Sequence, residues 1–220
     1  MVFKKFSIFI FLILYFSLSS SFATKNYPPE WWKPFPKEDA KPWEILPQEA
    51  KEGEVILSKR TELGILSNFA PTPFELDGKR YASVEGFWQM MKYPEPQDKM
   101  DPRNRADLTW PYTREEVTML SGFEAKDAGE ATKKNYEILG IKWISYRGKR
   151  MEYKGQDQQE HYELILQAIR AKINQNEKPR NILKTTGDLM LRPDHIQEAD
   201  APPAYRYYDI LMKIRSEFKD

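Results

Sequence analysis

The sequence predicts a helix-dominated α+β fold, a single compact domain from about residue 51 to residue 220 with small antiparallel hairpins. Three observations support this prediction. Two segments turn at a dipeptide that ends in glycine, Asp77-Gly78 and Arg147-Gly148, as hairpins do. Most other segments place apolar residues at the spacing of an amphipathic helix. With 220 residues, of which 40% are hydrophobic, the chain can bury one sizeable core, so one domain is expected.

Residues 1–23 are set apart from that domain because their pattern is typical of a secretory signal peptide. Lys4 and Lys5 precede an apolar run from Phe6 to Leu18, and Ser21-Phe22-Ala23 fits a small-x-small cleavage site. The alternative is an uncleaved N-terminal anchor, which the serines near the end of the run disfavour. The leader has no cysteine for a lipid anchor. We therefore expect a secreted, periplasmic or envelope protein with no stable membrane span once the leader is cleaved.

Charge and cysteine content exclude several classes of protein. Without cysteine the chain has no disulfide framework, no thiolate metal site and no cysteine nucleophile. The full chain has a formal net charge of +1, and because the leader contains two lysines and no acid, the remainder carries −1. A near-neutral domain lacks the basic excess that general nucleic-acid or membrane-surface binding requires, so neither is expected. The oligomeric state stays open.

Residues 24–50 form a proline- and tryptophan-rich segment ahead of the domain. They contain six prolines and three tryptophans and show neither helical nor strand periodicity, which predicts an extended arm. The arm either lies against the surface of the domain or binds the cell wall or a partner. Because the segment has no repeat and no known peptide signature, packing against the domain is favoured. The aromatic residues concerned are Trp31, Trp32, Phe35 and Trp43.

The domain is organised around residues 66–93, which follow a short strand candidate at 54–59. Asp77-Gly78 is a dipeptide preferred in type I′ turns, and the flanking FEL and KRY segments form two short strands. Ser83 is expected to cap a helix whose apolar residues fall at 84, 87, 88 and 91 and which Pro94 ends. Glu85 lies on the polar strip beside that apolar stripe.

The rest of the chain is expected to be mainly helical. Residues 94–112 read as a proline-rich loop, and no internal repeat is present. The expected elements are helices at 113–120 and 123–139, a hairpin at 141–153, a core helix at 158–174, a short helix at 176–186 that Gly187 ends, a brief strand or extended turn near 189–195, and a terminal helix from Tyr205 to Phe218.

Ordinary catalytic motifs are absent from the sequence. There is no phosphate-binding glycine loop, no G-x-S-x-G and no H-E-x-x-H. The only histidines, His161 and His195, lack metal-ligating companions at suitable spacing, so we expect them to be structural or surface residues and expect no metal or other cofactor. If the protein is an enzyme, the chemistry left by these exclusions is acid–base catalysis by carboxylates without a metal.

Glu85 allows two interpretations. In the first turn of a helix it faces the positive end of the helix dipole, which favours the ionised carboxylate and is expected to lower its pKa. Acidic residues are enriched there for stability alone, and this structural role is the commoner one.

Five basic residues are candidates for binding a phosphate: Arg103, Arg105, Arg147, Lys149 and Arg150. The alternative is that they form a solvated basic surface, and this alternative is favoured because acidic residues are interspersed among them.

Three separated blocks of the sequence resemble the NADAR superfamily. SNFAPTPFELDGKRYASVEGFWQMMKY is similar to its first signature, in which Ser-Asn-Phe and a hairpin lead to a helix that begins Ser/Thr-x-Glu and carries Phe/Trp-Gln. Residues 168–188 resemble the second signature, which ends in Thr-Gly-Asp, and residues 210–215 the closing helix. The resemblance implies a compact, mostly helical N-glycosidase whose substrates are phosphorylated or nucleotide-like, such as riboflavin-biosynthesis intermediates or ADP-ribose attached to a base.

The resemblance also implies roles for individual residues. Glu85 would be the active-site glutamate, which stabilises positive charge on the ribosyl group and activates a water. Asn68 and Phe69 would line the pocket, and Gln89 would orient the water or a sugar hydroxyl. The further substrate-binding candidates are Arg103, Arg105, Arg147 and Arg206.

The C-terminal part departs from the family pattern. The usual Trp-Gly-Asp and Asn-x-Leu-Gly segments are replaced, and no tryptophan follows Trp143. The family's aromatic ring that stacks on the base, and its second acid, are therefore missing from their usual places. Tyr205, Tyr207 or Asp200 could substitute for them. The alternative function is a catalytically impaired module of the same fold that binds a nucleotide, ADP-ribose or a protein. An exported effector or toxin would share the enzyme's chemistry.

Overall fold

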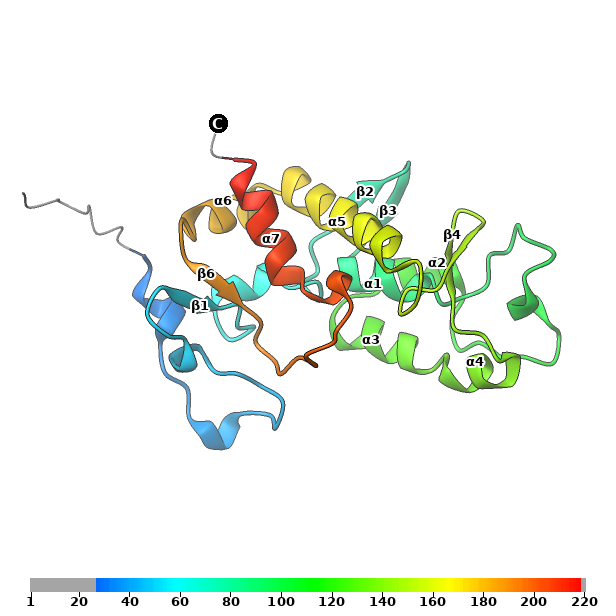
Figure 1. Cartoon of the computed structure of the whole chain (residues 1–220), viewed down its shortest axis with the longest axis horizontal. Helices are drawn as coiled ribbons and strands as arrows, with labels where there is room; N and C mark the ends of the chain where they lie inside the picture. Colours follow the sequence, from blue (N-terminus) through cyan, green and yellow to red (C-terminus); the bar gives the residue numbers. More distant parts are fainter. Residues whose placement is uncertain (1–26, 219–220) are drawn as a thin grey trace, which may run out of the picture.

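The computed structural model describes residues 27–218, so the expected signal peptide lies outside the described residues. The α-helices are α1 (Val84–Met90), α2 (Arg114–Thr118), α3 (Gly122–Glu130), α4 (Lys133–Leu139), α5 (Gln158–Gln175), α6 (Glu177–Thr185) and α7 (Tyr207–Ser216). The strands are β1 (Glu54–Ile56), β2 (Phe74–Leu76), β3 (Lys79–Tyr81), β4 (Ile144–Tyr146), β5 (Lys149–Met151) and β6 (Met190–Arg192). The helix-dominated α+β class is thus confirmed (Figure 1). Within the described range, no helix is both long and apolar enough to cross a membrane.

The two predicted hairpins form where the turn dipeptides stand. β2 pairs antiparallel with β3, and β4 with β5. Asp77 and Arg147 both have φ of 52°, and the glycine after each also has positive φ, the left-handed geometry that these tight turns require. The second hairpin turns at the expected position although arginine is not a favoured residue there.

Local capping signals fix the ends of several helices. Ser83 Oγ accepts a hydrogen bond from Gly86 N at 2.8 Å and so caps α1. The single helix predicted over 123–139 is divided into α3 and α4. At the break, Thr132 Oγ1 donates to Gly129 O at 2.8 Å, and such side-chain bonds to the backbone compete with continuous helix.

A third strand pair joins the two ends of the domain. β1 and β6 are parallel, with Val55 opposite Leu191, and lie side by side in Figure 1. The sequence predicted an extended segment at each place but not their pairing, because nothing local specifies a partner so distant in the chain. Helix α5 packs against α1, α6 and α7 and buries Ile165, Ile169 and Ile173 in the core.

The arm, residues 27–50, folds onto the domain in three 3-10 turns, η1 (Pro29–Trp32), η2 (Lys37–Asp39) and η3 (Pro47–Glu49). Trp31 is fully buried in the main core cluster, and its Nε1 donates to Glu62 Oε1 at 2.7 Å. Trp32 Nε1 donates to Glu54 O at 2.9 Å. The arm thus contributes a core residue and does more than cover the surface.

Candidate active site

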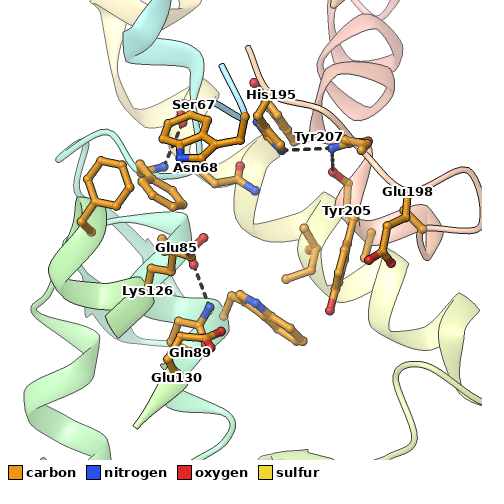
Figure 2. A pocket seen from close by; sticks show the side chains of 18 of the residues that line it. Ser67, Asn68, Glu85, Gln89, Lys126, Glu130, His195, Glu198, Tyr205 and Tyr207 are labelled. Carbon is orange, nitrogen blue, oxygen red and sulfur yellow. Dashed lines mark hydrogen bonds between the residues drawn. The ribbon is translucent and has the colours of Figure 1, made fainter. Parts of the chain in front are cut away.

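A pocket of about 490 Å³ lies where α1, α3 and the start of α5 meet the segment between β6 and α7 (Figure 2). The arm closes part of its rim through Trp43. The charged, polar and aromatic residues that line it are Trp43, Lys59, Ser67, Asn68, Phe69, Glu85, Trp88, Gln89, Lys92, Phe123, Lys126, Glu130, Lys154, His161, His195, Gln197, Glu198, Tyr205 and Tyr207.

Glu85 and Gln89 stand one turn apart on α1 and face this pocket. Glu85 is only 7% exposed, and its Oε1 accepts a hydrogen bond from Gln89 Nε2 at 2.7 Å. The backbone N–H of Glu85 donates to Asn68 O at 3.0 Å, which ties the first turn of α1 to the Ser67–Phe69 segment. The positive charges of Lys92, Lys126 and Lys59 lower the pKa of the carboxylate from a distance, without a hydrogen bond to it.

Burial raises the pKa of Glu85, and this effect exceeds the lowering caused by the Gln89 hydrogen bond and the nearby lysines. The expectation that the helix dipole lowers this pKa is therefore wrong, because the carboxylate is removed from water. A raised pKa suits a general base, since proton transfer is most effective when the pKa of the base approaches the working pH.

We expect the pH profile of activity to report this shift. If Glu85 acts as an ionised carboxylate, activity is present above its pKa and lost as the pH falls through it, so the acid limb of kcat/KM lies above 4.5. Gln89→Leu removes the hydrogen bond that lowers this pKa and should move the limb to higher pH. The profile is measured for both proteins and for Lys149→Met, an exposed lysine outside the pocket, as a control. A limb at or below pH 4.5, or one unmoved by Gln89→Leu, would contradict this.

Gly129 makes room for the Gln89 side chain. A Cβ at Gly129 would lie 1.7 Å from Gln89 Oε1 and 2.3 Å from Gln89 Cδ, so only glycine allows this rotamer. Gln89 Oε1 is buried without a hydrogen-bond partner among the residues that the structure describes. The Gln89 side chain is thus held between Glu85, to which its amide nitrogen donates, and the backbone of α3, against which its oxygen is packed.

Gly129→Ala is expected to lower kcat by roughly 10- to 100-fold, the equivalent of one hydrogen bond to a charged group. The new methyl group displaces Gln89 and removes its bond to Glu85, whereas stability changes little because Gln89 can swing aside. The test is a double-mutant cycle with Gln89→Ala. If Gly129 acts through Gln89, the second substitution adds little to the first, and fully additive losses would contradict the idea.

Four lysines bring positive charge to the pocket. Lys92 is half-buried, its Nζ lies 5.5 Å from the centre of the Trp88 ring, and burial lowers its pKa. Lys126 and Lys154 are exposed at the rim, and Lys59 Nζ is 2.6 Å from Asp194 Oδ2. Glu85, Glu130 and Glu198 line the same pocket, so the excess of positive charge there is small, and an anionic group such as a phosphate would be held by the ammonium groups that it contacts.

His195 forms a hydrogen-bonded network on the wall made by the segment after β6. Its Nδ1 lies 3.0 Å from Asp194 Oδ1, and Gln197 Nε2 lies 3.4 Å from its Nε2 while donating to Tyr205 O at 3.0 Å. Burial alone would raise the pKa of Asp194, but the hydrogen bonds and charges of His195 and Lys59 outweigh it and lower that pKa. The His195 ring is nearly parallel to that of Tyr207 at 6.3 Å.

His161 lies deeper in the pocket, at the start of α5. It is 1% exposed, and its ring centre is 4.4 Å from that of Trp88. Burial lowers the pKa of His161 to about 3, so the ring is neutral at ordinary pH. Neither ring nitrogen has a hydrogen-bond partner within residues 27–218. Both histidines thus line the pocket, whereas the sequence pattern had indicated structural or surface positions.

The structure brings together some of the predicted site residues and separates others. Asn68, Phe69, Glu85 and Gln89 line one pocket, as do the proposed substitutes Tyr205 and Tyr207, and Asp200 does not. None of the four predicted substrate-binding arginines lines it.

These arginines make other contacts. Arg103 is 1% exposed, bonds to the Asp101 carboxylate and Met91 O, and also donates to Ser145 Oγ, so it holds the proline-rich loop in place. Arg105 and Arg147 form exposed ion pairs. Arg105 Nη2 lies 2.6 Å from Asp107 Oδ2, and Arg147 Nη1 lies 3.1 Å from Asp77 Oδ2. Arg206 is exposed at the start of α7.

Sequence reasoning missed the lysines, His195, Glu198 and Trp43. One signal was present on α3, where Phe123, Lys126 and Glu130 follow helical spacing and line the pocket together. Lys92 falls on the same polar strip of the predicted first helix as Glu85 and Gln89, and the remaining residues come from segments without helical periodicity.

No protein-family model matches the chain, and no curated protein does. Among solved structures, the chain is similar to the NMR structure of the E. coli protein YbiA, with a TM-score of 0.45 and 20% sequence identity. The similarity covers 73% of this chain and 80% of that protein. A similarity of this size assigns no activity. Across the described residues, no group of three or more acidic or histidine side chains could hold a metal ion.

Proposed function

We propose that this chain is an N-glycosidase that hydrolyses the ribosyl C1′–N bond of a phosphorylated riboside or an ADP-ribosyl conjugate. One observation carries the proposal. Glu85 is a buried carboxylate on the wall of the pocket whose single hydrogen bond to a side chain, within the described part of the chain, comes from neutral Gln89. Burial of a carboxylate without a paired cation is unfavourable, and such a group suits a site in which positive charge develops on a ligand.

The proposed reaction requires a negative charge beside the ribosyl group and a group that accepts a proton from water, and a carboxylate such as Glu85 can supply both. As the C1′–N bond breaks, its electron pair leaves with the base nitrogen and positive charge builds on the ribosyl group. An ionised Glu85 beside C1′ would stabilise that charge. Water then adds to C1′ and gives a proton to Glu85, while the departing nitrogen takes a proton from solvent. Glu85 afterwards releases its proton to solvent, which restores the carboxylate. The products are a base with a new N–H and a sugar with a new hydroxyl.

The surrounding residues suit the rest of such a substrate. Gln89 donates from its amide nitrogen to Glu85 Oε1 and so fixes the position of the carboxylate on the pocket wall. Lys92 and Lys126, which act on Glu85 through their charge, are placed to offset a phosphate. Tyr205, whose pKa is raised by burial, stays protonated and can donate a hydrogen bond from the opposite wall. We further propose that residues 1–23 direct the enzyme out of the cytosol.

The proposal is tested with a panel of ADP-ribose conjugates and phosphorylated purine and pyrimidine ribosides. Wild-type protein should release base from at least one member, and Glu85→Gln should not do so at a comparable rate. Equal release by the two proteins would overturn the mechanism. Calorimetric binding of ADP-ribose by wild type without turnover of any conjugate would replace the proposal with the alternative, a binding module.

A further inference from the structure

Three aromatic rings gather at the rim of the pocket, and we call Trp43, Phe69 and Phe123 the rim cluster. The Phe69 and Phe123 rings meet edge to face with centres 5.3 Å apart, and Trp43 lies 6.3 Å from Phe123. Trp43 is 41% exposed and Phe123 is 51% exposed, although both line the cavity. Two large rings thus keep much of their surface in water beside the proposed site, where a flat ligand could cover it.

The backbone around Trp43 is fixed on both sides. Ile196 N donates to Trp43 O at 3.1 Å, and Ile45 N donates to Asp194 O at 2.9 Å, so that Glu44 forms an antiparallel bridge with His195. Arg60 Nε and Nη2 hold the Glu44 carboxylate at 2.6 and 2.9 Å. The arm therefore presents its tryptophan at a set place on the rim, which lowers the entropy cost of binding a ligand there.

The charged groups beside the rim cluster indicate which kind of ligand the pocket can bind. Lys59 Nζ lies 5.2 Å from the centre of the Phe69 ring, and Lys126 follows Phe123 by one turn on the same face of α3. Glu85 lies further inside the pocket. Exposed rings, ammonium groups and a buried carboxylate in one cavity correspond to the base, the phosphate and the sugar of a nucleotide.

From this arrangement we propose that the rim cluster stacks on the planar base of the substrate, and that the arm supplies the principal ring through Trp43. The inference rests on the proposed function, since the base is the leaving group of that reaction. It assigns a substrate-binding role to a segment outside the predicted domain.

The test compares two ligands that differ only in the base, AMP and ribose 5-phosphate. Their binding to the Glu85→Gln protein, which should not consume AMP, is measured by calorimetry with and without Trp43→Ala. Removing an aromatic ring that stacks on a base typically weakens binding by about tenfold or more. We expect Trp43→Ala to weaken AMP binding by that factor and to leave ribose 5-phosphate binding within about twofold.

Two further variants separate stacking from a loss of structure. Trp43→Phe keeps a ring and should restore most of the AMP affinity, and Met119→Ala, an exposed apolar residue outside the pocket, should change neither ligand. Unchanged AMP affinity in Trp43→Ala, equal weakening of both ligands, or no AMP binding by the Glu85→Gln protein would each overturn the inference. Turnover by wild type decides the proposed function separately, so that a failure of the stacking inference can be told apart from a failure of the proposed function.

Discussion

Replacing Glu85 with glutamine is expected to lower kcat by about 10²- to 10³-fold, the usual effect of removing one group that stabilises charge in a transition state. The amide has nearly the same shape as the carboxylate but cannot offset positive charge on the ribosyl group or accept a proton from water. Base release is followed by chromatography under single-turnover and steady-state conditions, so that the chemical step is separated from product release.

The control for this change is Glu124→Gln. Glu124 is also a first-turn glutamate, on α3, but it is exposed and does not line the pocket, so its replacement should leave kcat within about twofold. Glu85→Gln should fold and still bind a substrate analogue, because Gln89 can bond to an amide oxygen as well as to a carboxylate. If the two substitutions had the same effect on kcat, Glu85 would have no catalytic role.

Trp31→Ala is expected to lower the free energy of unfolding by about 3–5 kcal/mol, the range for removing a large buried aromatic side chain. The substitution leaves a cavity in the core cluster and deprives Glu62 of its hydrogen bond from Trp31 Nε1. Urea denaturation followed by circular dichroism measures the change.

The matched control is a second tryptophan of the arm. Trp43 is 41% exposed, so Trp43→Ala should change the free energy of unfolding by less than about 1 kcal/mol. A small effect of both substitutions would mean that the arm does not fold with the domain in solution.

Features that depend on neighbouring residues were predictable from the sequence. Asp77-Gly78 and Arg147-Gly148 turn where expected, Ser83 caps α1, and Gly140 and Gly187 adopt the left-handed conformation that ends a helix. Each signal acts within a few residues, so that tertiary packing has little scope to override it.

Features that depend on distant residues were not predictable. The parallel pairing of β1 and β6, the burial of Trp31 and the place of His195 are all set by contacts across the length of the chain. The pKa of Glu85 shows the same limit, because the sequence reveals the helix dipole but not the desolvation that outweighs it. Three of the four predicted arginines pair with acids away from the pocket: Arg103 with Asp101 and Arg105 with Asp107 in the same loop, and Arg147 with Asp77 of the other hairpin.

The bridge between Glu44 and His195 makes the rim of the pocket depend on both ends of the described chain. Trp43 is held by a segment that lies some 150 residues further along the sequence. The same segment leads to Tyr205 and Tyr207 on the pocket wall. A chain that ended before His195 would therefore lose the backbone hydrogen bonds that place Trp43 as well as these two tyrosines.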